Sequence, residues 1–502
     1  MRSALSIMAA TLMLAVGTGQ LAVQAAPALK PSIIFILTDD QTLKDVEAMP
    51  KVRALLADRG VSFSNYFVSY ALCCPSRSSI LRGQYAHNTG VRGNLPPIGG
   101  FQTFHARGNE TSTVGTWLQA AGYRTGYFGK YLNGYPRGVS PTYVPPGWDE
   151  WDSPAGGNPY SEFNYRMNEN GKIVAYGAGP DDYMTDVLAN KAVEFAQRGG
   201  KPFFIHLAVY APHQPATPAP RYARAPVDGT APRSPSFNEP DVTDKPSWLQ
   251  RLNPLTTRQI AVMDLLYQRR LRSLLAVDDL VAALVDALRT SGQLEHTYIF
   301  FSSDNGFHFG DHRLPLGKNT AYEEDIRVPL IVTGPSVPAG RTVPHLAVNI
   351  DLGPTWADLA GAQTPNFVDG RSLVPLLGAT PPPIDRWRQS ILIEHWAQER
   401  GEEAESDEGT NPPAVPPRRL VRGTPTLAAI HTRDYVYIEY ETGDRELYDL
   451  RKDPFELRNL IGTTGRPFLD AVAARLAALR RCAGPACRTA EDTAPPALPA
   501  TP

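Results

Sequence analysis

Residues 73 to 83, with the sequence CCPSRSSILRG, carry the residue types best suited to chemistry in this chain. Pro75 suits the first turn of a helix, where its missing N–H leaves no hydrogen bond unmade. Cys73 would then lie at the mouth of that helix, where free N–H groups and the positive end of the helix dipole favour a bound anion. Arg77, four residues later, could lie on the same face. The alternative is a buried cysteine pair that packs as small apolar side chains.

Two polar segments, Asp39-Asp40 and Asp304-Asn305, each follow an apolar run. Ligand sites in open α/β sheets lie outside the carboxyl ends of the strands. Successive strand residues point to opposite faces, so Asp39 and Asp40 can converge only if the strand has already ended. Each segment by itself is also a good turn. Together the three carboxylates and one amide oxygen form an all-oxygen set that suits a hard cation such as Ca²⁺.

The elements that must position these side chains alternate along the sequence. Continuous β-branched and apolar runs, typical of strands buried on both faces of a parallel sheet, lie at 32–38, 202–209, 298–302 and 328–332. Helical patterns lie between them at 114–121, 183–197 and 259–288. This alternation predicts a layered α/β domain.

The chain has 502 residues, which is enough for more than one core. After about residue 385 the pattern changes to short strands followed by a closing helix. We expect a signal peptide at 1–25, a catalytic domain at 26–385, a smaller α+β domain at 386–480 and a flexible tail at 481–502. Residues 401–418 are acidic and then proline-rich, which predicts a mobile insertion.

Both ends of the chain indicate export. A positive charge at Arg2 precedes a mostly apolar stretch that is too short for a comfortable membrane span, and residues 23–25 offer a small-residue cleavage pattern. Cys482 and Cys487 enclose a short loop that an oxidising compartment would close as a disulfide. We therefore expect a secreted, periplasmic or cell-surface protein without a stable membrane anchor. The net charge of −2 gives no field that would hold nucleic acid.

The pattern Cys-X-Pro-Ser-Arg with a downstream Leu-Arg-Gly resembles the signature of type I sulfatases, in which the first cysteine is oxidised to formylglycine. In this chain that residue is Cys73, and Cys74 occupies the variable position. The resemblance extends over nearly the whole mature chain and is strongest to N-acetylglucosamine-6-sulfatases and extracellular heparan 6-O-endosulfatases. It implies an α/β, alkaline-phosphatase-like sandwich with a large, mostly parallel central sheet and a smaller C-terminal α+β domain. The matching segments lie at 39–40, 73–83, 126–133, 144–148, 211–213, 304–308, 316–318, 323–329, 446–450 and 453–454.

The resemblance also implies roles for individual residues. The ligands of Ca²⁺ would be Asp39, Asp40, Asp304 and Asn305, together with an oxygen of the modified Cys73. Arg77 and Lys130 would hold the hydrated aldehyde. Lys318 would bind sulfate oxygens and, with His213, would serve the leaving alcohol. A formylglycine-generating enzyme would act on the chain during maturation.

The expected activity is the release of inorganic sulfate from a sulfated carbohydrate, with 6-O-sulfated N-acetylglucosamine or glucosamine as the expected substrate. Three alternatives stay open: an arylsulfatase of broad specificity acting on aryl sulfates, a phosphodiesterase or phosphonate monoester hydrolase on the same scaffold, and an unmodified secreted glycan-binding protein. Leu132 stands where some lysosomal arylsulfatases have a histidine, which weakens the first alternative.

Several further residues have no assigned role at this stage. Trp148 and Trp151 could stack on a sugar ring or pack in the core. His87, His308 and His312 could serve the site or only satisfy local hydrogen bonds.

Overall fold

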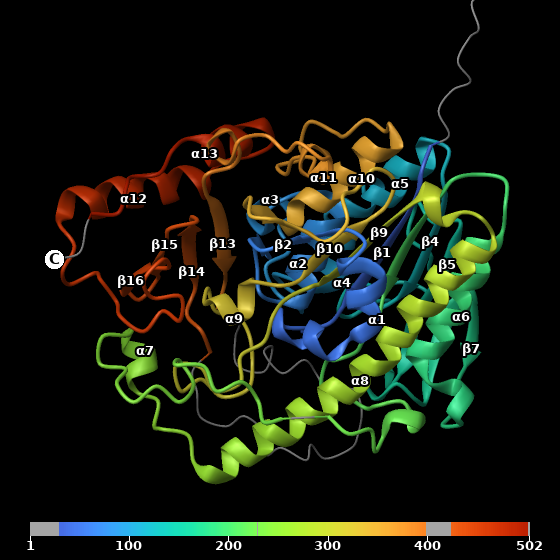
Figure 1. Ribbon diagram of the computed structural model, residues 1–502, viewed down its shortest axis with the longest axis horizontal. Helices are drawn as coiled ribbons and strands as arrows, with labels where there is room; N and C mark the ends of the chain where they lie inside the picture. The colour runs from blue at the N-terminus through green and yellow to red at the C-terminus, as the bar shows by residue number, and fades with distance from the viewer. Residues whose placement is uncertain (1–29, 228, 398–422, 500–502) are drawn as a thin grey trace, which may run out of the picture.

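The computed structural model describes residues 30–227, 229–397 and 423–499. The predicted signal peptide at 1–25 and the predicted insertion at 401–418 lie outside the described residues. A ten-stranded sheet forms the centre of the molecule (Figure 1). From one edge to the other it contains β11 (Arg341–Val343), β2 (Val61–Phe63), β10 (Leu330–Thr333), β9 (Thr297–Ser303), β1 (Ser32–Thr38), β8 (Phe203–Ala208), β4 (Arg124–Gly129), β5 (Glu150–Gly157), β6 (Tyr165–Glu169) and β7 (Lys172–Ala175).

The five neighbouring strands β9, β1, β8, β4 and β5 are parallel, and antiparallel pairings occur only toward the two edges. Alternate residues of β1 enter two different cores. Ile33 and Phe35 pack with helices α2 (Cys73–Arg82), α5 (Val114–Ala120) and α10 (Leu352–Ala360) on one face. Ile34 and Ile36 pack with α6 (Met184–Gln197) and α8 (Thr257–Thr290) on the other. Because both faces are covered, the central strands are continuous apolar runs, as the sequence predicted.

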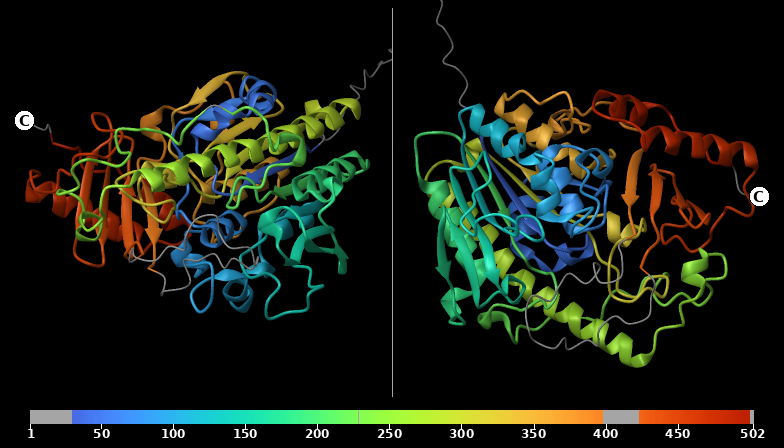
Figure 2. Two further views of the ribbon diagram at one scale, coloured as in Figure 1. Left: turned by 90° about the horizontal axis from the view of Figure 1, so that it is seen from below. Right: turned by 180° about the vertical axis from the view of Figure 1, so that it is seen from behind.

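A second, antiparallel sheet contains β13 (Ile391–His395), β14 (Leu427–His431), β15 (Tyr435–Tyr440) and β16 (Arg445–Asp449). Helix α12 (Arg466–Leu479) packs on it. This unit lies beside the central sheet in all three views (Figure 1 and Figure 2). The predicted fold class, a large mostly parallel sheet with a smaller C-terminal α+β part, is confirmed.

The segment predicted as a flexible tail from residue 481 differs from that expectation in its described part. It forms helix α13 (Pro485–Asp492), and Glu491 of this helix is fully buried. The Glu491 carboxylate accepts hydrogen bonds from Arg388 Nε at 2.8 Å and from the Tyr85 hydroxyl at 2.5 Å. The tail composition of Ala, Pro and Thr gave no sign of this, because the partners of Glu491 lie more than a hundred residues earlier.

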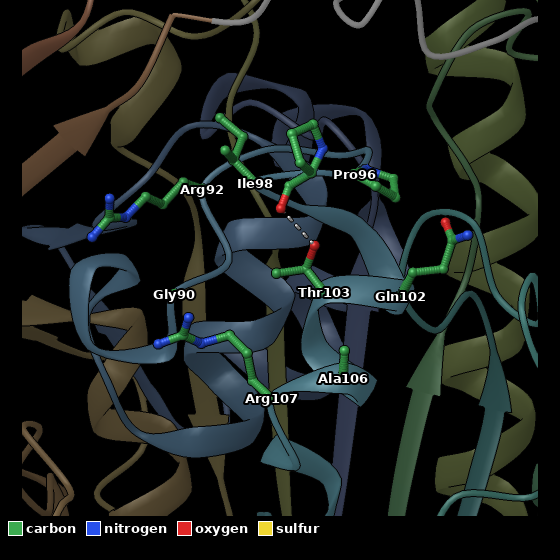
Figure 3. Close-up of a pocket in the computed structure, with 9 residues that line it drawn as sticks. Gly90, Arg92, Pro96, Ile98, Gln102, Thr103, Ala106 and Arg107 are labelled. Atoms are coloured by element: carbon green, nitrogen blue, oxygen red, sulfur yellow. Dashed lines mark hydrogen bonds between the residues drawn. The ribbon is translucent and has the colours of Figure 1, made fainter.

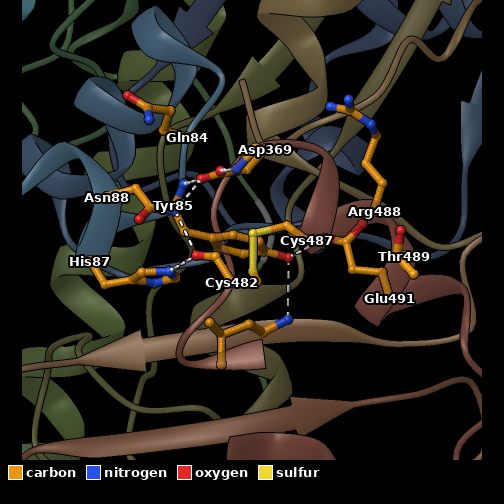
Figure 4. The surroundings of a disulfide bond; sticks show 12 residues. Gln84, Tyr85, His87, Asn88, Asp369, Cys482, Cys487, Arg488, Thr489 and Glu491 are labelled. Carbon is orange, nitrogen blue, oxygen red and sulfur yellow. Dashed lines mark hydrogen bonds between the residues drawn. A yellow bond between two sulfur atoms is a disulfide. The ribbon is translucent and has the colours of Figure 1, made fainter. Parts of the chain in front are cut away.

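A disulfide joins Cys482, which precedes this helix, to Cys487 in its first turn (Figure 4). The His87 ring points to the same place, with Nε2 2.9 Å from the Cys482 carbonyl oxygen and Nδ1 2.9 Å from the Glu394 carboxylate. Both partners are hydrogen-bond acceptors, so both are satisfied only when the imidazole carries two protons. His87 therefore joins the C-terminal segment to the rest of the chain, and its contacts account for it without a substrate.

Candidate active site

The carboxyl ends of four neighbouring parallel strands, β9, β1, β8 and β4, lie together, and the residues that follow these strands form most of the site. Thr38, the last residue of β1, pairs with Ser303, the last residue of β9, so Asp39 and Asp304 leave the sheet side by side. The backbone N–H of Asp304 donates to the Thr38 carbonyl at 3.1 Å. Strand β4 leads directly into Lys130. Strand β8 leads, five residues later, to His213.

The turn after β1 brings Asp40 to the same side as Asp39. Asp40 has φ of 66°, in the left-handed region that Asp and Asn adopt more readily than most residues. Its N–H donates to Asp304 Oδ1 at 3.1 Å. The strand has thus ended, as convergence of the two carboxylates requires.

Cys73 is the first residue of α2, and the following N–H, of Cys74, is capped by Asn94 Oδ1 at 2.9 Å. The Cys73 sulfur lies 3.4 Å from Asp39 Oδ1 and 2.9 Å from Lys318 Nζ. Cys74 faces the other way and belongs to the apolar core. Burial raises the pKa of the Cys74 thiol to about 12, so it stays protonated.

Three buried cations surround the carboxylates. Arg77 Nε donates to Asp304 Oδ2 at 2.8 Å, and Lys130 Nζ lies 2.5 Å from Asp39 Oδ2. Lys318 Nζ lies 2.6 Å from Asp40 Oδ1. Burial opposes the ionisation of Asp39, but the charges of Lys130 and Arg77 outweigh it and hold the pKa of Asp39 below its usual value. Burial and the nearby charge of Asp39 raise the pKa of Asp304.

His213 reaches the same cluster from the end of β8. Its Nδ1 lies 2.7 Å from the Gln214 carbonyl oxygen, which fixes the proton on Nδ1 and turns Nε2 toward the site. Nε2 is 3.7 Å from Asp40 Oδ2. The ring also contacts Tyr160, with 4.6 Å between centroids. A base or acid is thus held at the edge of the carboxylate cluster.

The donor set suits a divalent cation. One potential ligand atom from each of Asp39, Asp40, Cys73 and His213 lies within 4.8 Å of the others. Asn305 Oδ1 is buried without a hydrogen-bond partner, while its Nδ2 donates to Asp40 Oδ1 at 2.6 Å. A buried amide oxygen left without a donor is costly unless a ligand satisfies it. Asp304 lies outside the four-residue group and contacts Arg77 instead.

Sequence reasoning missed two residues that hold this arrangement. Arg270 on α8 is fully buried, and its guanidinium lies 2.5 Å from the Asp40 carbonyl oxygen and 3.1 Å from Asp45 Oδ2. An arginine on the apolar face of a predicted helix was the available signal. Asn94, which caps α2, comes from a loop without any pattern that could have identified it.

A pocket of about 280 Å³ opens beside the site and is lined by Lys130, Arg137, Tyr160 and Tyr210, among others. Trp148 and Trp151 do not line it. Both are buried and pack against Tyr127 with ring centroids 5.1 and 4.8 Å away, so the hypothesis that they stack on a sugar is wrong.

A larger surface pocket of about 520 Å³ lies near α3 (Ala86–Thr89) and α4 (Gly100–Ala106), with Arg92 and Arg107 at its rim (Figure 3). No candidate catalytic residue lines it.

The model of the family described as Sulfatase matches residues 31–362. The chain belongs to the sulfatase family. It is 36% identical over 491 residues to N-acetylglucosamine-6-sulfatase from Homo sapiens, an alignment that covers 93% of this chain and 87% of that protein. It is 37% identical over 377 residues to the putative extracellular sulfatase Sulf-1 homolog from Caenorhabditis elegans, covering 72% of this chain and 52% of that one. The protein is therefore a sulfuric ester hydrolase, and this family generally uses formylglycine and a divalent metal.

A solved structure confirms the alkaline-phosphatase-like fold of the sulfatase. It is that of a protein in complex with its substrate D-glucosamine-2-N,6-O-disulfate, with a TM-score of 0.69 and 24% sequence identity, covering 93% of this chain and 99% of that one. Within the described residues of the sulfatase, no helix combines the length and apolar character needed to cross a membrane.

Proposed function

We propose that this sulfatase releases inorganic sulfate from the 6-O-position of glucosamine or N-acetylglucosamine residues in sulfated glycans. The observation that carries the proposal is the position of the Cys73 sulfur, which lies between a carboxylate cluster and Lys318. The sugar specificity is supported by the 36% identity to N-acetylglucosamine-6-sulfatase and by the fold shared with a protein solved with a glucosamine disulfate.

The nucleophile is formylglycine made from Cys73 by a formylglycine-generating enzyme. The Sγ atom of Cys73 therefore stands where the first oxygen of the hydrated aldehyde would lie. Hydrated formylglycine supplies two hydroxyl groups on one carbon, one to attack sulfur and one to expel sulfate by restoring the aldehyde. Cys74, with its buried and protonated thiol, stays unmodified.

The metal is Ca²⁺, held by Asp39, Asp40, Asp304 and Asn305. Oxygen ligands suit this hard cation. Bound there, Ca²⁺ would favour the ionised form of a nearby hydroxyl and offset the charge of the sulfate group.

The remaining side chains move or neutralise charge. Lys130 and Arg77, which both contact Asp39 Oδ2, offset the charge of the nucleophile and hold it in place. Lys318 binds sulfate oxygens next to residue 73. His213 keeps its Nδ1 proton on the Gln214 carbonyl oxygen and, when Nε2 is protonated as well, gives the Nε2 proton to the departing sugar oxygen, so that the alcohol leaves neutral. The pocket beside Lys130 receives the sugar ring.

Sulfate release measured by ion chromatography tests this proposal. We expect turnover of N-acetylglucosamine 6-sulfate to exceed that of the 3-sulfate and of 4-nitrophenyl sulfate, and the Cys73→Ala variant to serve as the blank. N-Acetylglucosamine 6-phosphate tests the phosphate-ester alternative on the same alcohol. Faster turnover of the phosphate, or of the aryl sulfate alone, would overturn the proposed substrate.

We also propose that the protein acts outside the cytoplasm, on the basis of its N-terminal residues and of relatives named extracellular sulfatases. Fractionation of producing cells should recover the activity outside the cytoplasm, from a chain that begins near residue 26. Activity confined to the cytoplasm would contradict this.

A further inference from the structure

A second group of metal-ligand side chains lies away from Cys73, where the C-terminal unit meets the central domain. One potential ligand atom from each of His312, Glu324 and Glu456 lies within 4.8 Å of the other two. Each of the three residues has a buried polar atom without a hydrogen-bond partner, namely His312 Nε2, Glu324 Oε2 and Glu456 Oε1. His312 and Glu456 are almost completely buried, with exposed fractions of 0% and 1%.

The His312 ring is prepared as a ligand. Its Nδ1 lies 2.7 Å from the Glu239 carboxylate, so the proton resides on Nδ1 and the lone pair on Nε2. A carboxylate that accepts from the distal nitrogen is the usual second contact of a metal-bound histidine. With Nε2 unpartnered and buried, the imidazole is oriented for a ligand that the protein itself does not provide.

Each glutamate is held by one oxygen and leaves the other without a partner. Glu324 Oε1 accepts from the Ser236 hydroxyl at 3.1 Å, and Glu456 Oε2 accepts from the Glu323 N–H at 3.0 Å. Among the described residues, neither Glu324 nor Glu456 forms an ion pair with a lysine or arginine. Lys245, a cation nearby, instead contacts Glu239 at 3.3 Å and the Leu457 carbonyl at 2.6 Å.

The charge in this region is unbalanced. Burial raises the pKa of Glu456 well above its usual value, and the neighbouring charges of Glu323 and Glu324 add to the effect. Burial and the charge of Asp311 do the same to Glu324. Buried acidic groups of this kind are stabilised either by protonation or by a bound cation.

We propose that His312, Glu324 and Glu456 bind a divalent transition-metal ion of the Zn²⁺ or Mn²⁺ type, at a site separate from the one beside Cys73. One imidazole nitrogen and two carboxylate oxygens match the ligands that these ions accept, whereas Ca²⁺ disfavours imidazole. The three ligands come from three parts of the chain, so the bound ion would also link these parts and stabilise the fold.

The position of this site connects it with catalysis. His312 lies in the loop that begins with Asp304 and Asn305 and ends with Lys318. Glu324 belongs to α9 (Glu323–Ile326), which lies between the C-terminal sheet and the central domain (Figure 1). The ion would tie this loop to the C-terminal unit and would so fix the positions of side chains at both ends of the loop.

The test uses tag-free, full-length enzyme kept in excess Ca²⁺, so that the site beside Cys73 stays filled. Elemental analysis should find one transition-metal ion per chain after reloading of chelator-treated enzyme with Zn²⁺ and removal of free metal. The Glu456→Gln and His312→Asn variants should lose that ion. Glu446→Gln is the matched control, because it changes a buried carboxylate of the same unit that hydrogen-bonds to tyrosines instead. It should retain the ion.

A second readout does not depend on the variants. Addition of Zn²⁺ to stripped wild-type enzyme should raise the Tm, because a ligand that binds only the folded state stabilises it. Wild-type enzyme loaded with Co²⁺ in place of Zn²⁺ should show the visible absorption bands of a nitrogen- and oxygen-ligated ion. This measurement uses no variant, so it tests the proposal even if a variant fails to fold. Wild-type enzyme with no bound transition metal and no Tm shift would overturn the proposal and assign the two glutamates to a shared proton. Binding that survives in both His312→Asn and Glu456→Gln would overturn it equally.

Discussion

Arg77 Nε lies 2.8 Å from Asp304 Oδ2, although 227 residues separate them in the chain. The contact joins the first turns of α2 to the residue that follows β9, and Arg77 also reaches Asp39, which follows the neighbouring strand β1, at 3.4 Å. One guanidinium thus holds two carboxylates that would otherwise repel each other. The nucleophile helix and the carboxylate cluster are therefore a single assembly.

Asp304→Ala should remove activity by roughly 10²–10³-fold or more, because it deletes a charge that stabilises the reacting groups. The change also leaves Arg77 with one carboxylate partner in a buried position. We expect bound Ca²⁺, measured by elemental analysis, to fall with activity, while far-UV circular dichroism stays close to that of the wild type. Full activity in excess chelator, with metal analysis confirming that the ion has gone, would contradict the metal role.

Arg270→Met should weaken the site without touching substrate. Arg270 donates to the carbonyl of Asp40, so its loss frees the turn that carries that carboxylate. Partners of metal ligands typically contribute about 10–100-fold in affinity or activity, and we expect a fall of that size in kcat/KM and in Ca²⁺ affinity. Loss of a buried charge partner for Asp45 should also destabilise the protein by about 3–5 kcal/mol. Arg272→Met, on the same helix, serves as the control. Equal losses of activity in both variants would contradict a specific role for Arg270.

The predictable part of this structure is the part with local patterns. Strands β1, β8 and β9 are continuous apolar runs because both of their faces are buried, and their register places Asp39 beside Asp304. The sequence could therefore predict the edge of the sheet at which the site lies. The motif around Cys73 predicted the first turn of α2 for a similar reason, since Pro75 restricts the backbone locally.

The parts that could not be predicted depend on partners far away in the chain. Arg270 is a charged residue on the apolar face of a helix, and only its contact with the Asp40 carbonyl explains it. The residue type of Trp151 is compatible with stacking on a sugar ring, but Trp151 packs against Tyr127 in the core. Helix α13 lies in a segment whose Ala, Pro and Thr content suggested a flexible tail, and it is held to the rest of the chain by the buried ion pair between Glu491 and Arg388. In each case the deciding contact joins residues whose spacing carries no signal.

The His87–Glu394 contact should make stability depend on pH. Burial opposes the charged imidazole, but the Glu394 carboxylate outweighs it and raises the pKa of His87 above 6.5 in the folded state. In the unfolded chain the value is about 6.5. The stabilisation is therefore fully present below about pH 6.5 and is lost as pH rises through the higher, folded-state pKa.

Denaturant unfolding of wild type and His87→Gln across pH 5 to 9 checks this prediction. The difference in free energy of unfolding between the two should be largest at the acidic end and should shrink toward alkaline pH. Glu394→Gln should remove most of that dependence as well. A difference that grows with pH would contradict the assignment.

Tyr160→Phe and Tyr160→Ala should distinguish the contribution of the Tyr160 ring to substrate binding from that of its hydroxyl group. The Tyr160 ring lies 4.9 Å from Lys130 Nζ and also packs against His213. An aromatic contact with the sugar is worth about 1 kcal/mol, so removing the ring should lower kcat/KM for N-acetylglucosamine 6-sulfate roughly fivefold. The Phe variant keeps the ring and should stay near the wild-type value. A loss in Phe as large as in Ala would assign the effect to the hydroxyl group instead.

The two adjacent cysteines should behave differently. Cys73 faces Asp39 and Lys318, whereas Cys74 packs in the core with its pKa raised to about 12 by burial. Cys74→Ala should keep substantial activity and lose about 1 kcal/mol of stability, because only packing is removed. Cys73→Ala should lower kcat by about 10³-fold or more, since neither the metal nor the cations provide a nucleophile.

Cys73→Ser adds the mechanistic distinction between these outcomes. A serine hydroxyl can attack sulfur, but it cannot expel the sulfate by forming an aldehyde, so this variant should stall with sulfate attached to residue 73. Peptide mass spectrometry should find that adduct in Cys73→Ser, and in the wild type an aldehyde or its hydrate at residue 73 beside an intact thiol at residue 74. The maturation enzyme acts on a cysteine, so co-expression with it should raise the specific activity of the wild type and leave Cys73→Ser unchanged. Fully active enzyme with a free thiol at Cys73 would end the formylglycine assignment, because a thiolate has no second hydroxyl with which to release the sulfate.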